Sequence, residues 1–159
     1  MRVAFVSQPF DNIIPPVEVG SIGIWTYQVM RALADREIEF VVYSKRFADQ
    51  PLVEHYDGVE YRRVSVPSLL DETAARPFKL AEKLLRYPWP KRPFFSTIGS
   101  NLAYIWGVAS DLRSQQIDIV HVHNFAQFVP VIRRLNPRVK IVLHMQCEWL
   151  SQLDRAMVE

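Results

Sequence analysis

The sequence has little of what builds disulfide-bonded or membrane-spanning proteins. It contains one cysteine among 159 residues, which excludes an internal disulfide and suits a reducing compartment. No apolar run reaches the roughly 18 residues that a membrane-spanning helix needs. Only four apolar residues stand between Arg2 and Ser7, too few for a signal peptide. We therefore expect a soluble protein of the cytoplasm.

Charge of one sign is also scarce. The 19 Lys and Arg residues nearly balance the 17 Asp and Glu residues, for a net charge of +2. This balance argues against a dedicated nucleic-acid binder, and any basic partner surface must be local. Apolar residues form 49% of the chain and charged residues 23%, which favours a folded core over disorder. We predict a single domain over residues 1–159.

Two familiar nucleotide-binding motifs are missing. The segment Gly20-Ser-Ile-Gly23 is not the dinucleotide fingerprint G-x-G-x-x-G, and the second predicted strand ends without the acidic residue that would hold a ribose. No Gly-Lys-Ser/Thr occurs, so a Walker-type phosphate loop is absent. The sequence therefore predicts no resident cofactor and no NAD or ATP site of the usual kinds.

Strand patterns are plentiful. Residues 2–7, 38–44, 118–123 and 139–145 are almost continuously apolar, as in strands that are buried on both faces of a parallel sheet. Residues 59–66 alternate instead, which predicts an edge strand. Helical patterns fill the gaps, so we expect an α/β fold with a doubly wound, mostly parallel sheet flanked by helices, the Rossmann-like arrangement. Ligands of such sheets bind beyond the carboxyl ends of the strands.

Three helices are predicted from apolar residues at helical spacing. The first places Ile22, Trp25, Val29 and Leu33 on its buried face. The second has the apolar stripe Ile98, Leu102, Ile105, Ala109 and Leu112, with Ser96 or Thr97 as its N-cap. A shorter helix covers residues 128–135 and ends before Pro137. Residues 148–159 also read as a helix.

The loop at Gly20, Ser21, Ile22 and Gly23 is the first candidate site. It carries two glycines from a buried strand to a helix N-terminus, where backbone N–H groups are unpaired and the helix dipole is positive. A phosphate or sugar could approach this backbone closely. The alternative is a tight turn with Gly20 or Ser21 as an ordinary N-cap.

The segment Asp118-Ile-Val-His-Val-His-Asn124 is the second candidate. Alternate strand residues share a face, so His121 and His123 point the same way. His123 and Asn124 lie at the carboxyl end, and His121 lies deeper. An imidazole there could bind a sugar hydroxyl or act as an acid or base at neutral pH. The alternative is a structural pair bonded to backbone carbonyls. Two histidines without a third ligand at metal spacing do not predict a metal site.

Polar residues also follow the last predicted strand. Gln146 and Glu148 would lie on the binding edge, where they could contact hydroxyl groups. Cys147 stands near His144, but no orienting third group is evident, which favours a buried structural thiol over a nucleophile.

A basic and aromatic stretch runs from Arg76 to Phe95, with six bases against one acid. It fits a solvated helix face whose aromatic residues pack in the core. It also fits a peripheral membrane patch. A nucleic-acid surface is the least favoured of the three, because no recognisable module is present.

Taken together, these motifs resemble the N-terminal domain of glycosyltransferase family 4, enzymes of the two-domain GT-B architecture. The resemblance rests on the opening strand, Pro15-Pro16, the Gly20-Ser21 loop, the segment Arg31-Ala-Leu33, residues 38–43 and the Asp118–His123 motif. The segment Val142-Leu-His-Met-Gln146 falls where the family often has a strand ending in His, and Gln146 departs from that pattern.

The resemblance implies a retaining, metal-independent transfer of a sugar from a nucleotide-diphosphate sugar to a sugar or lipid-linked acceptor. The Gly20-Ser21 loop would lie near the donor diphosphate, and His123 would contact the donor sugar or the acceptor. The stretch from Arg76 to Phe95 would suit contact with the inner face of a membrane.

Most donor contacts of this architecture belong to a second, nucleotide-sugar-binding domain, for which this sequence has no counterpart. The resemblance therefore implies a fragment of a transferase or one subunit of a split one. The alternatives are a non-catalytic binding or regulatory module with the same fold, or another GT-B relative such as a sugar epimerase.

Overall fold

The computed structural model describes residues 1–67 and 101–146. Six strands and three helices are placed in this part of the chain. In order along the chain, the elements are β1 (Arg2–Val6), α1 (Ser21–Ala32), β2 (Glu39–Lys45), β3 (Val53–Tyr56), β4 (Val59–Val64), α4 (Leu102–Leu112), β5 (Ile119–His123), α5 (Phe128–Leu135) and β6 (Lys140–His144).

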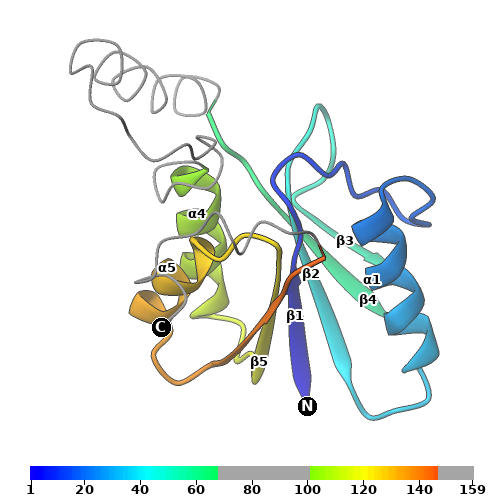
Figure 1. The fold of residues 1–159 in the computed structure, drawn as a ribbon. Coiled ribbons are helices and arrows are strands. Elements are labelled where there is room, and N and C mark those ends of the chain that lie inside the picture. Colours follow the sequence, from blue (N-terminus) through cyan, green and yellow to red (C-terminus); the bar gives the residue numbers. More distant parts are fainter. Residues whose placement is uncertain (68–100, 147–159) are drawn as a thin grey trace.

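The strands form one sheet in the order β3-β4-β2-β1-β5-β6. All neighbouring pairs are parallel except β3 with β4. Figure 1 shows α1 over one face of the sheet and α4 and α5 over the other. The structure thus confirms the predicted α/β fold with a mostly parallel, doubly wound sheet.

The order in which the chain adds strands to the sheet changes side between β1 and β5. From β1 the chain adds β2 and then β4 on one side, and it later adds β5 and β6 on the other side. The connections leaving β1 and β5 lead to helices on opposite faces (Figure 1). In open α/β sheets the ligand crevice forms at such a reversal, beyond the carboxyl ends of the strands. The fold therefore directs attention to the segments that follow β1 and β5.

Each face of the sheet buries its own core. One core joins strand residues such as Ala4, Val6 and Val120 to α4 and α5. The other joins residues of opposite parity, such as Phe5 and Val42, to α1 and the loop before it. Because both faces are covered, β1 and β2 are apolar at nearly every position, which is why their continuous apolar runs identified them.

The prediction that residues 59–66 form an edge strand is wrong. β4 pairs with β2 on one side and with β3 on the other, and β3 is the edge strand. A tight turn at Asp57-Gly58 joins β3 to β4, and both turn residues have positive φ, 50° and 74°. That conformation matches the right-handed twist of paired strands, and Asp-Gly sequences favour it.

The buried faces of two helices differ in part from the predicted ones. In α1 the buried residues include Ile22, Thr26 and Met30, whereas Trp25 and Val29 are half-buried. In α4 the residues Ile105, Ala109 and Leu112 are buried as predicted, but Leu102 is 40% exposed. The N-cap of α4 is Asn101, and the proposed caps Ser96 and Thr97, like Ile98, lie outside the described residues.

Several predicted features cannot be compared with the structure. The basic and aromatic stretch from Arg76 to Phe95, the helix over residues 148–159, and the residues Cys147 and Glu148 lie outside the described residues. Within the described ranges, no helix is long and apolar enough to cross a membrane.

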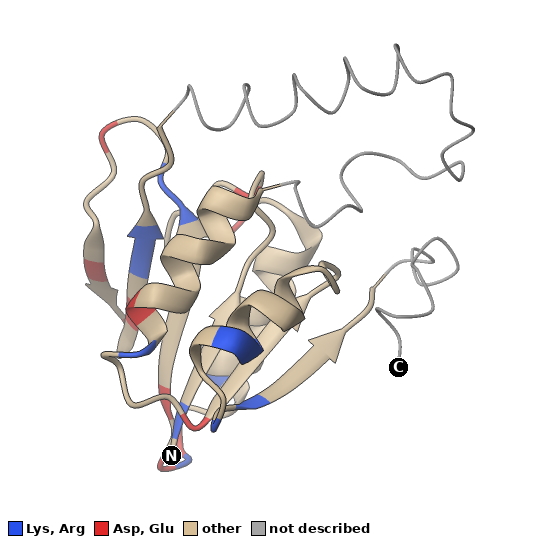
Figure 2. Ribbon diagram, turned by 90° about the vertical axis from the view of Figure 1, so that its left-hand side faces the viewer, with Lys and Arg blue, Asp and Glu red and all other residues tan. Residues whose placement is uncertain are grey.

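An ion-pair network, made of Arg2, Tyr43, Glu60, Arg62 and Asp111, lies on the α4 side of the sheet. The guanidinium of Arg62 donates to both carboxylate oxygens of Asp111, at 2.6 and 2.9 Å. The Tyr43 hydroxyl donates to the same carboxylate at 2.7 Å, and Arg2 donates to Glu60 at 2.7 Å. Figure 2 shows charged residues of both signs gathered around the N-terminal end of the sheet.

Candidate functional site

The candidate site lies at the carboxyl end of the sheet, where β1 and β5 are direct neighbours. Two segments meet there. One is the β1–α1 loop, residues 7–20, and the other is the turn that follows β5. A hydrogen bond joins α1 to the end of β5: the Thr26 hydroxyl lies 3.1 Å from Nε2 of His123. The structure therefore brings together the two motifs that the sequence analysis singled out separately.

The helix α1 begins directly after Gly20, which is its N-cap with φ at 85°. Of the two caps that the alternative offered, the structure has Gly20 and not Ser21, and the cap makes no side-chain hydrogen bond. Ser21 is exposed, whereas Ile22 and Gly23 are buried. The first N–H groups of a helix have no partner within the helix. A ligand at this end would therefore meet Gly20, Ser21 and backbone N–H groups, with Ile22 facing the core.

Gly23 allows close packing at the start of α1. A Cβ atom there would lie 3.0 Å from Ile13 Cδ1 and 3.0 Å from Val17 Cγ1. Both of those side chains belong to the β1–α1 loop and are buried. The missing side chain lets the loop lie against the first turn of α1, and this contact sets the position of Gly20.

A buried arginine also holds the β1–α1 loop. Arg63 of β4 is 4% exposed and donates to the carbonyl of Ile13 at 3.2 Å, to the carbonyl of Pro51 at 3.1 Å, and to Glu54 at 2.6 Å. The sequence analysis missed this residue. The signal was available, because the alternation of residues 59–66 places Arg63 on the same face as Val59 and Tyr61.

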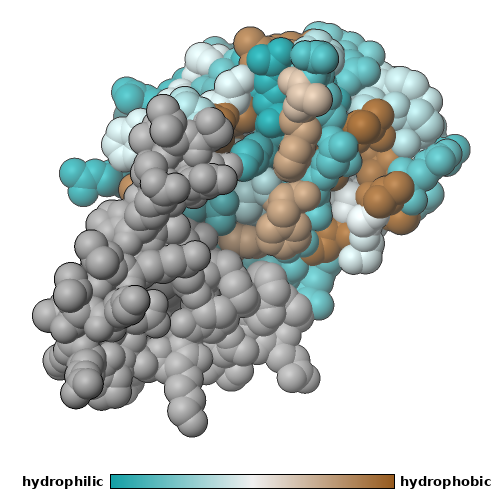
Figure 3. Space-filling model, turned by 90° about the horizontal axis from the view of Figure 1, so that it is seen from above, coloured by the Kyte–Doolittle hydropathy of each residue, from teal (hydrophilic) through white to brown (hydrophobic). Residues whose placement is uncertain are grey.

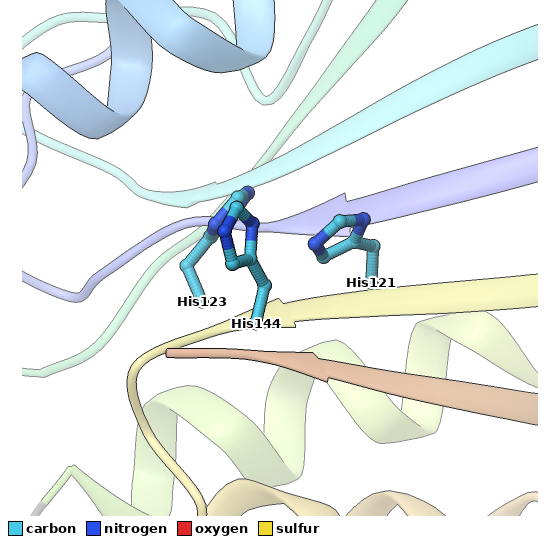
Figure 4. Close-up of side chains that lie close together, drawn as sticks. All are labelled: His121, His123 and His144. Carbon is cyan, nitrogen blue, oxygen red and sulfur yellow. The ribbon is translucent and has the colours of Figure 1, made fainter. Parts of the chain in front are cut away.

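His121, His123 and His144, the histidine cluster, lie together on the α1 face of the sheet (Figure 4). His123 and His144 are register partners on β5 and β6. The ring centroids of His121 and His123 are 4.8 Å apart, and His144 lies 5.3 and 5.6 Å from them. The structure corrects the expectation that no third histidine is near, because parallel pairing brings His144 beside the other two.

Trp25 covers this cluster from α1. Its ring packs edge-on against all three imidazoles, with centroid distances of 5.7 Å to His121, 5.4 Å to His123 and 4.7 Å to His144. Trp25 is half-buried: it packs against the core on the α1 side and also covers the histidine cluster.

His123 is the most buried member of the cluster, with 1% of its surface exposed, whereas His121 is half-buried. His121 lies further from the carboxyl end of β5, as expected, but it is the less buried of the two because α1 covers the end of the strand. Burial, with smaller effects from the neighbouring histidines, lowers the pKa of His123 to about 3. Burial and His144 lower the pKa of His121 to about 4. Both imidazoles are neutral at pH 7.

One nitrogen on each ring lacks a partner. Nε2 of His121, Nδ1 of His123 and Nδ1 of His144 are buried without a hydrogen bond in the described part of the chain. The alternative of a structural pair bonded to backbone carbonyls is therefore not what the structure contains. Leaving a buried polar group unpaired costs about 1–3 kcal/mol, and such groups in native proteins call for an explanation.

Asn124 and Gln146 meet directly after the two strands. Asn124 adopts a left-handed conformation with φ at 59°, and its Oδ1 accepts a hydrogen bond from the Gln146 backbone N–H at 2.6 Å. The side chain of Asn124 is buried and fastens the segment after β6 to the end of β5. Gln146 is exposed at this end of the sheet.

Asp11 is a site residue that the sequence analysis missed. Its Oδ1 lies 4.0 Å from the position that a Cβ would occupy on Gly20. Burial raises the pKa of this carboxyl group, against smaller opposing hydrogen bonds from Gln8. Asp11 therefore places a hydrogen-bond acceptor beside the start of α1.

The β1–α1 loop also exposes apolar side chains. Phe10, Ile14 and Val19 are 59, 54 and 79% exposed. Seen from above the carboxyl end, the described surface carries separate hydrophobic areas among polar ones (Figure 3). Exposed apolar residues that stand singly are normal on a protein surface.

Comparison with known proteins agrees with this fold. Sucrose-phosphate synthase from Thermosynechococcus elongatus is similar with a TM-score of 0.54 and 14% identity, over 99% of this chain and 38% of that one. The E. coli trehalose-6-phosphate protein bound with UDP-2-fluoro glucose is similar with a TM-score of 0.56 and 16% identity, over 90% of this chain and 32% of that one. The chain thus spans about a third of the length of these proteins. The fold is the Rossmann-like fold of GT-B glycosyltransferases.

No curated protein sequence matches the chain significantly. A family-level match nevertheless covers most of it: residues 20–158 match the glycosyl transferase 4-like domain. This range contains α1 with its N-cap, the histidine cluster and the Asn124 contact with Gln146. The chain therefore belongs to the glycosyl transferase 4-like domain family.

Proposed function

We propose that this chain is the N-terminal half of a retaining glycosyltransferase, which moves a sugar from a nucleotide-diphosphate sugar to an acceptor hydroxyl. In the reaction, the bond between the anomeric carbon and the phosphate oxygen breaks. A new bond forms to the acceptor oxygen, and the acceptor proton leaves. The observation that carries the proposal is the meeting of α1 and β5 at the sheet reversal, in a chain of this family.

The start of α1 is proposed as the site for the donor diphosphate. Gly20 leaves space above its backbone: among the described residues, a Cβ added there would meet only Asp11 Oδ1, at 4.0 Å. The positive end of the helix dipole and the free N–H groups favour an anion there. Asp11 would be placed to accept a hydrogen bond from a sugar hydroxyl. Ile22 and Gly23 would contribute through their backbone N–H groups, since their side-chain positions face the interior.

His123 is proposed to act in transfer, and two routes are open to it. It would contact the donor sugar or acceptor directly, or it would act as a positioning residue that holds α1 through Thr26. The burial of its ring favours the second route. His121, Asn124 and Gln146 would form the adjoining wall of the site, with Glu148 next in sequence.

The proposed partners are a second domain or partner subunit that supplies the remaining donor contacts, and a sugar or lipid-linked acceptor. This follows from the share of the similar structures that the chain spans, 32 to 38%. Location in the cytoplasm, with the stretch from Arg76 to Phe95 against the inner face of a membrane, remains part of the same proposal. No cofactor is assigned a role in transfer.

The first test compares two glycines in the complete assembly. Gly20→Ala adds a methyl group where the diphosphate would approach, and we expect donor turnover to fall at least about tenfold. Gly58→Ala is a matched control, because Gly58 also has positive φ, 74°, and open space around it, but it lies in the β3–β4 turn. Both changes strain the backbone by about 1 kcal/mol. Equal turnover in the two variants would overturn the assignment of the loop and favour a non-catalytic binding module.

A second comparison separates the routes for His123. His123→Ala should reduce transfer by either route. Thr26→Val keeps the shape of residue 26 and the imidazole but removes the hydroxyl that His123 contacts. If His123 positions α1, Thr26→Val reduces transfer to a similar degree, and the loss appears mainly in the donor KM. Full activity of Thr26→Val beside an inactive His123→Ala would instead show direct contact with the substrate.

A further inference from the structure

The histidine cluster has a property that sugar transfer does not use. Each of the three residues offers one ring nitrogen, and these nitrogens all lie within 4.8 Å of one another. Each ring also carries one buried nitrogen without a hydrogen-bond partner in the described residues. We propose that His121, His123 and His144 form a binding site for a divalent transition-metal cation of the zinc type, with one coordination position left for water or a solute.

The chemistry of the ligands selects the class of metal. Imidazole nitrogen suits zinc, copper and nickel, whereas magnesium and calcium require oxygen ligands. No carboxylate belongs to this cluster among the described residues. A histidine binds a metal through the lone pair of its neutral imidazole, so metal binding would compete with protonation.

The separation of the nitrogens is close to what a metal requires. Zinc binds imidazole nitrogen at about 2.0–2.1 Å, so two ligands of a tetrahedral site stand about 3.3 Å apart. The rings lie at the ends of two adjoining strands (Figure 4), and the widest nitrogen separation is 4.8 Å. Rotation of the imidazoles about the bond to the ring, a torsion with a broad energy minimum, can close this difference without moving the strands.

Thr26 would orient one of the three ligands, His123. Metal-binding histidines usually donate their second ring N–H to an oxygen, which fixes the tautomer. The Thr26 hydroxyl lies 3.1 Å from Nε2 of His123. With the proton on Nε2, the lone pair remains on Nδ1, the nitrogen that has no partner among the described residues. Thr26 is therefore a positioning residue for this site.

Trp25 provides a signal for binding. Its ring lies 4.7 to 5.7 Å from the three imidazoles, close enough for bound cobalt or copper to quench its fluorescence. The chain has four tryptophans, so Trp25→Phe identifies which part of the quenching comes from the cluster.

The experiment uses the 159-residue chain after treatment with a chelator. Zinc is added in competition with a chromophoric chelator, and cobalt is added to record its absorption spectrum. We expect one metal per chain, a tetrahedral cobalt spectrum, and quenching that Trp25→Phe largely removes. His121→Phe and His144→Phe keep aromatic packing and should each weaken binding at least about 100-fold. Circular dichroism establishes that both variants are folded.

Two matched controls test whether the metal binds at the histidine cluster. His55→Phe removes the fourth histidine, which is exposed on β3, and should leave binding unchanged. Cys147→Ser should also leave it unchanged, and the cobalt spectrum should lack a sulfur-to-metal band. Binding weaker than about 1 mM, binding that survives His121→Phe with His144→Phe, or binding lost in Cys147→Ser would each overturn the site. None of these outcomes bears on the transferase proposal, since the measurement involves no donor sugar.

Discussion

The two faces of the sheet carry polar clusters of opposite character. On the α4 side, the ion-pair network satisfies its charges internally: Asp111 accepts two hydrogen bonds from Arg62 and one from Tyr43. On the α1 side, the histidine cluster leaves a buried nitrogen on each of its three rings without a partner in the described chain. Both clusters are at least partly buried, and in the network only Nε of Arg2 lacks a hydrogen-bond partner among the buried side-chain atoms of the described residues.

This contrast separates a structural role from a functional one. Burial by itself would raise the pKa of Asp111, but the hydrogen bonds from Arg62 and Tyr43 outweigh it and the pKa is lowered. For His121 and His123, burial lowers the pKa and no described carboxylate opposes it. Natural proteins break the rule of polar satisfaction mainly at functional sites. The histidine cluster lies where the fold places its ligand crevice, and the ion-pair network lies away from it.

The largest expected effect comes from breaking the ion-pair network. Asp111→Ala leaves Nε and Nη2 of Arg62 and the hydroxyl of Tyr43 without their acceptor, while Nη1 of Arg62 still donates to Glu60. We expect the free energy of unfolding to fall by about 3 kcal/mol. Glu39→Ala removes a carboxylate that is 3.6 Å from Arg2 but 80% exposed, and it should cost less than about 0.5 kcal/mol. Urea unfolding measures both. Similar losses in the two variants would contradict the structural role of the network.

The next effect is a dependence of stability on pH. The pKa of His123 is about 3 in the folded protein and near 6.5 when unfolded, so the unfolded chain binds more protons between these values. The contribution of neutral His123 to the free energy of unfolding is complete above pH 6.5 and is lost as the pH falls. Between pH 7.5 and 5.0 this amounts to about 2 kcal/mol. Urea unfolding with a chelator present should show a smaller loss in His123→Phe than in the wild type. Equal losses would contradict the assignment.

The smallest expected effect is a difference in stability between two substitutions by phenylalanine. Tyr43→Phe removes a hydroxyl that Asp111 uses, so it should cost about 1 kcal/mol. His144→Phe keeps the edge-on packing against Trp25 but removes an unpaired nitrogen, so stability should stay within about 1 kcal/mol of wild type or rise. Thermal unfolding with a chelator present measures both. A clear loss in His144→Phe would show that its nitrogen has a structural partner.

The parallel sheet could be predicted well because strands that are buried on both faces have nearly continuous apolar sequences. Residues 2–7 and 38–44 are almost wholly apolar, and residues 118–123 alternate apolar residues with His121 and His123. The short helix over residues 128–135 appears with those same bounds. The sequence pattern did not predict β3, whose four residues are mostly exposed and include Glu54 and His55. The Asp57-Gly58 turn was the available signal for that hairpin.

The site was predicted only in part, because its members come from elements whose neighbours a sequence does not reveal. His123 and the Gly20 loop could be placed at the same end of the sheet. The third histidine could not, since the pairing of β5 with β6 is what sets His144 opposite His123. Thr26 and Trp25 were likewise hidden, because the exact rotation of α1 on the sheet decides which of its residues reach the cluster.

The central claim is that this domain holds half of a transfer site and needs a second half. The most direct measurement is the intact mass, under denaturing conditions, of the protein and of any co-purifying chain as its own cell produces them. The chain has a mass of 18.5 kDa, and a second domain of similar size would bring the assembly to at least about twice that. We predict such a longer chain or a tightly bound partner. A homogeneous chain of 18.5 kDa with no partner would contradict the claim.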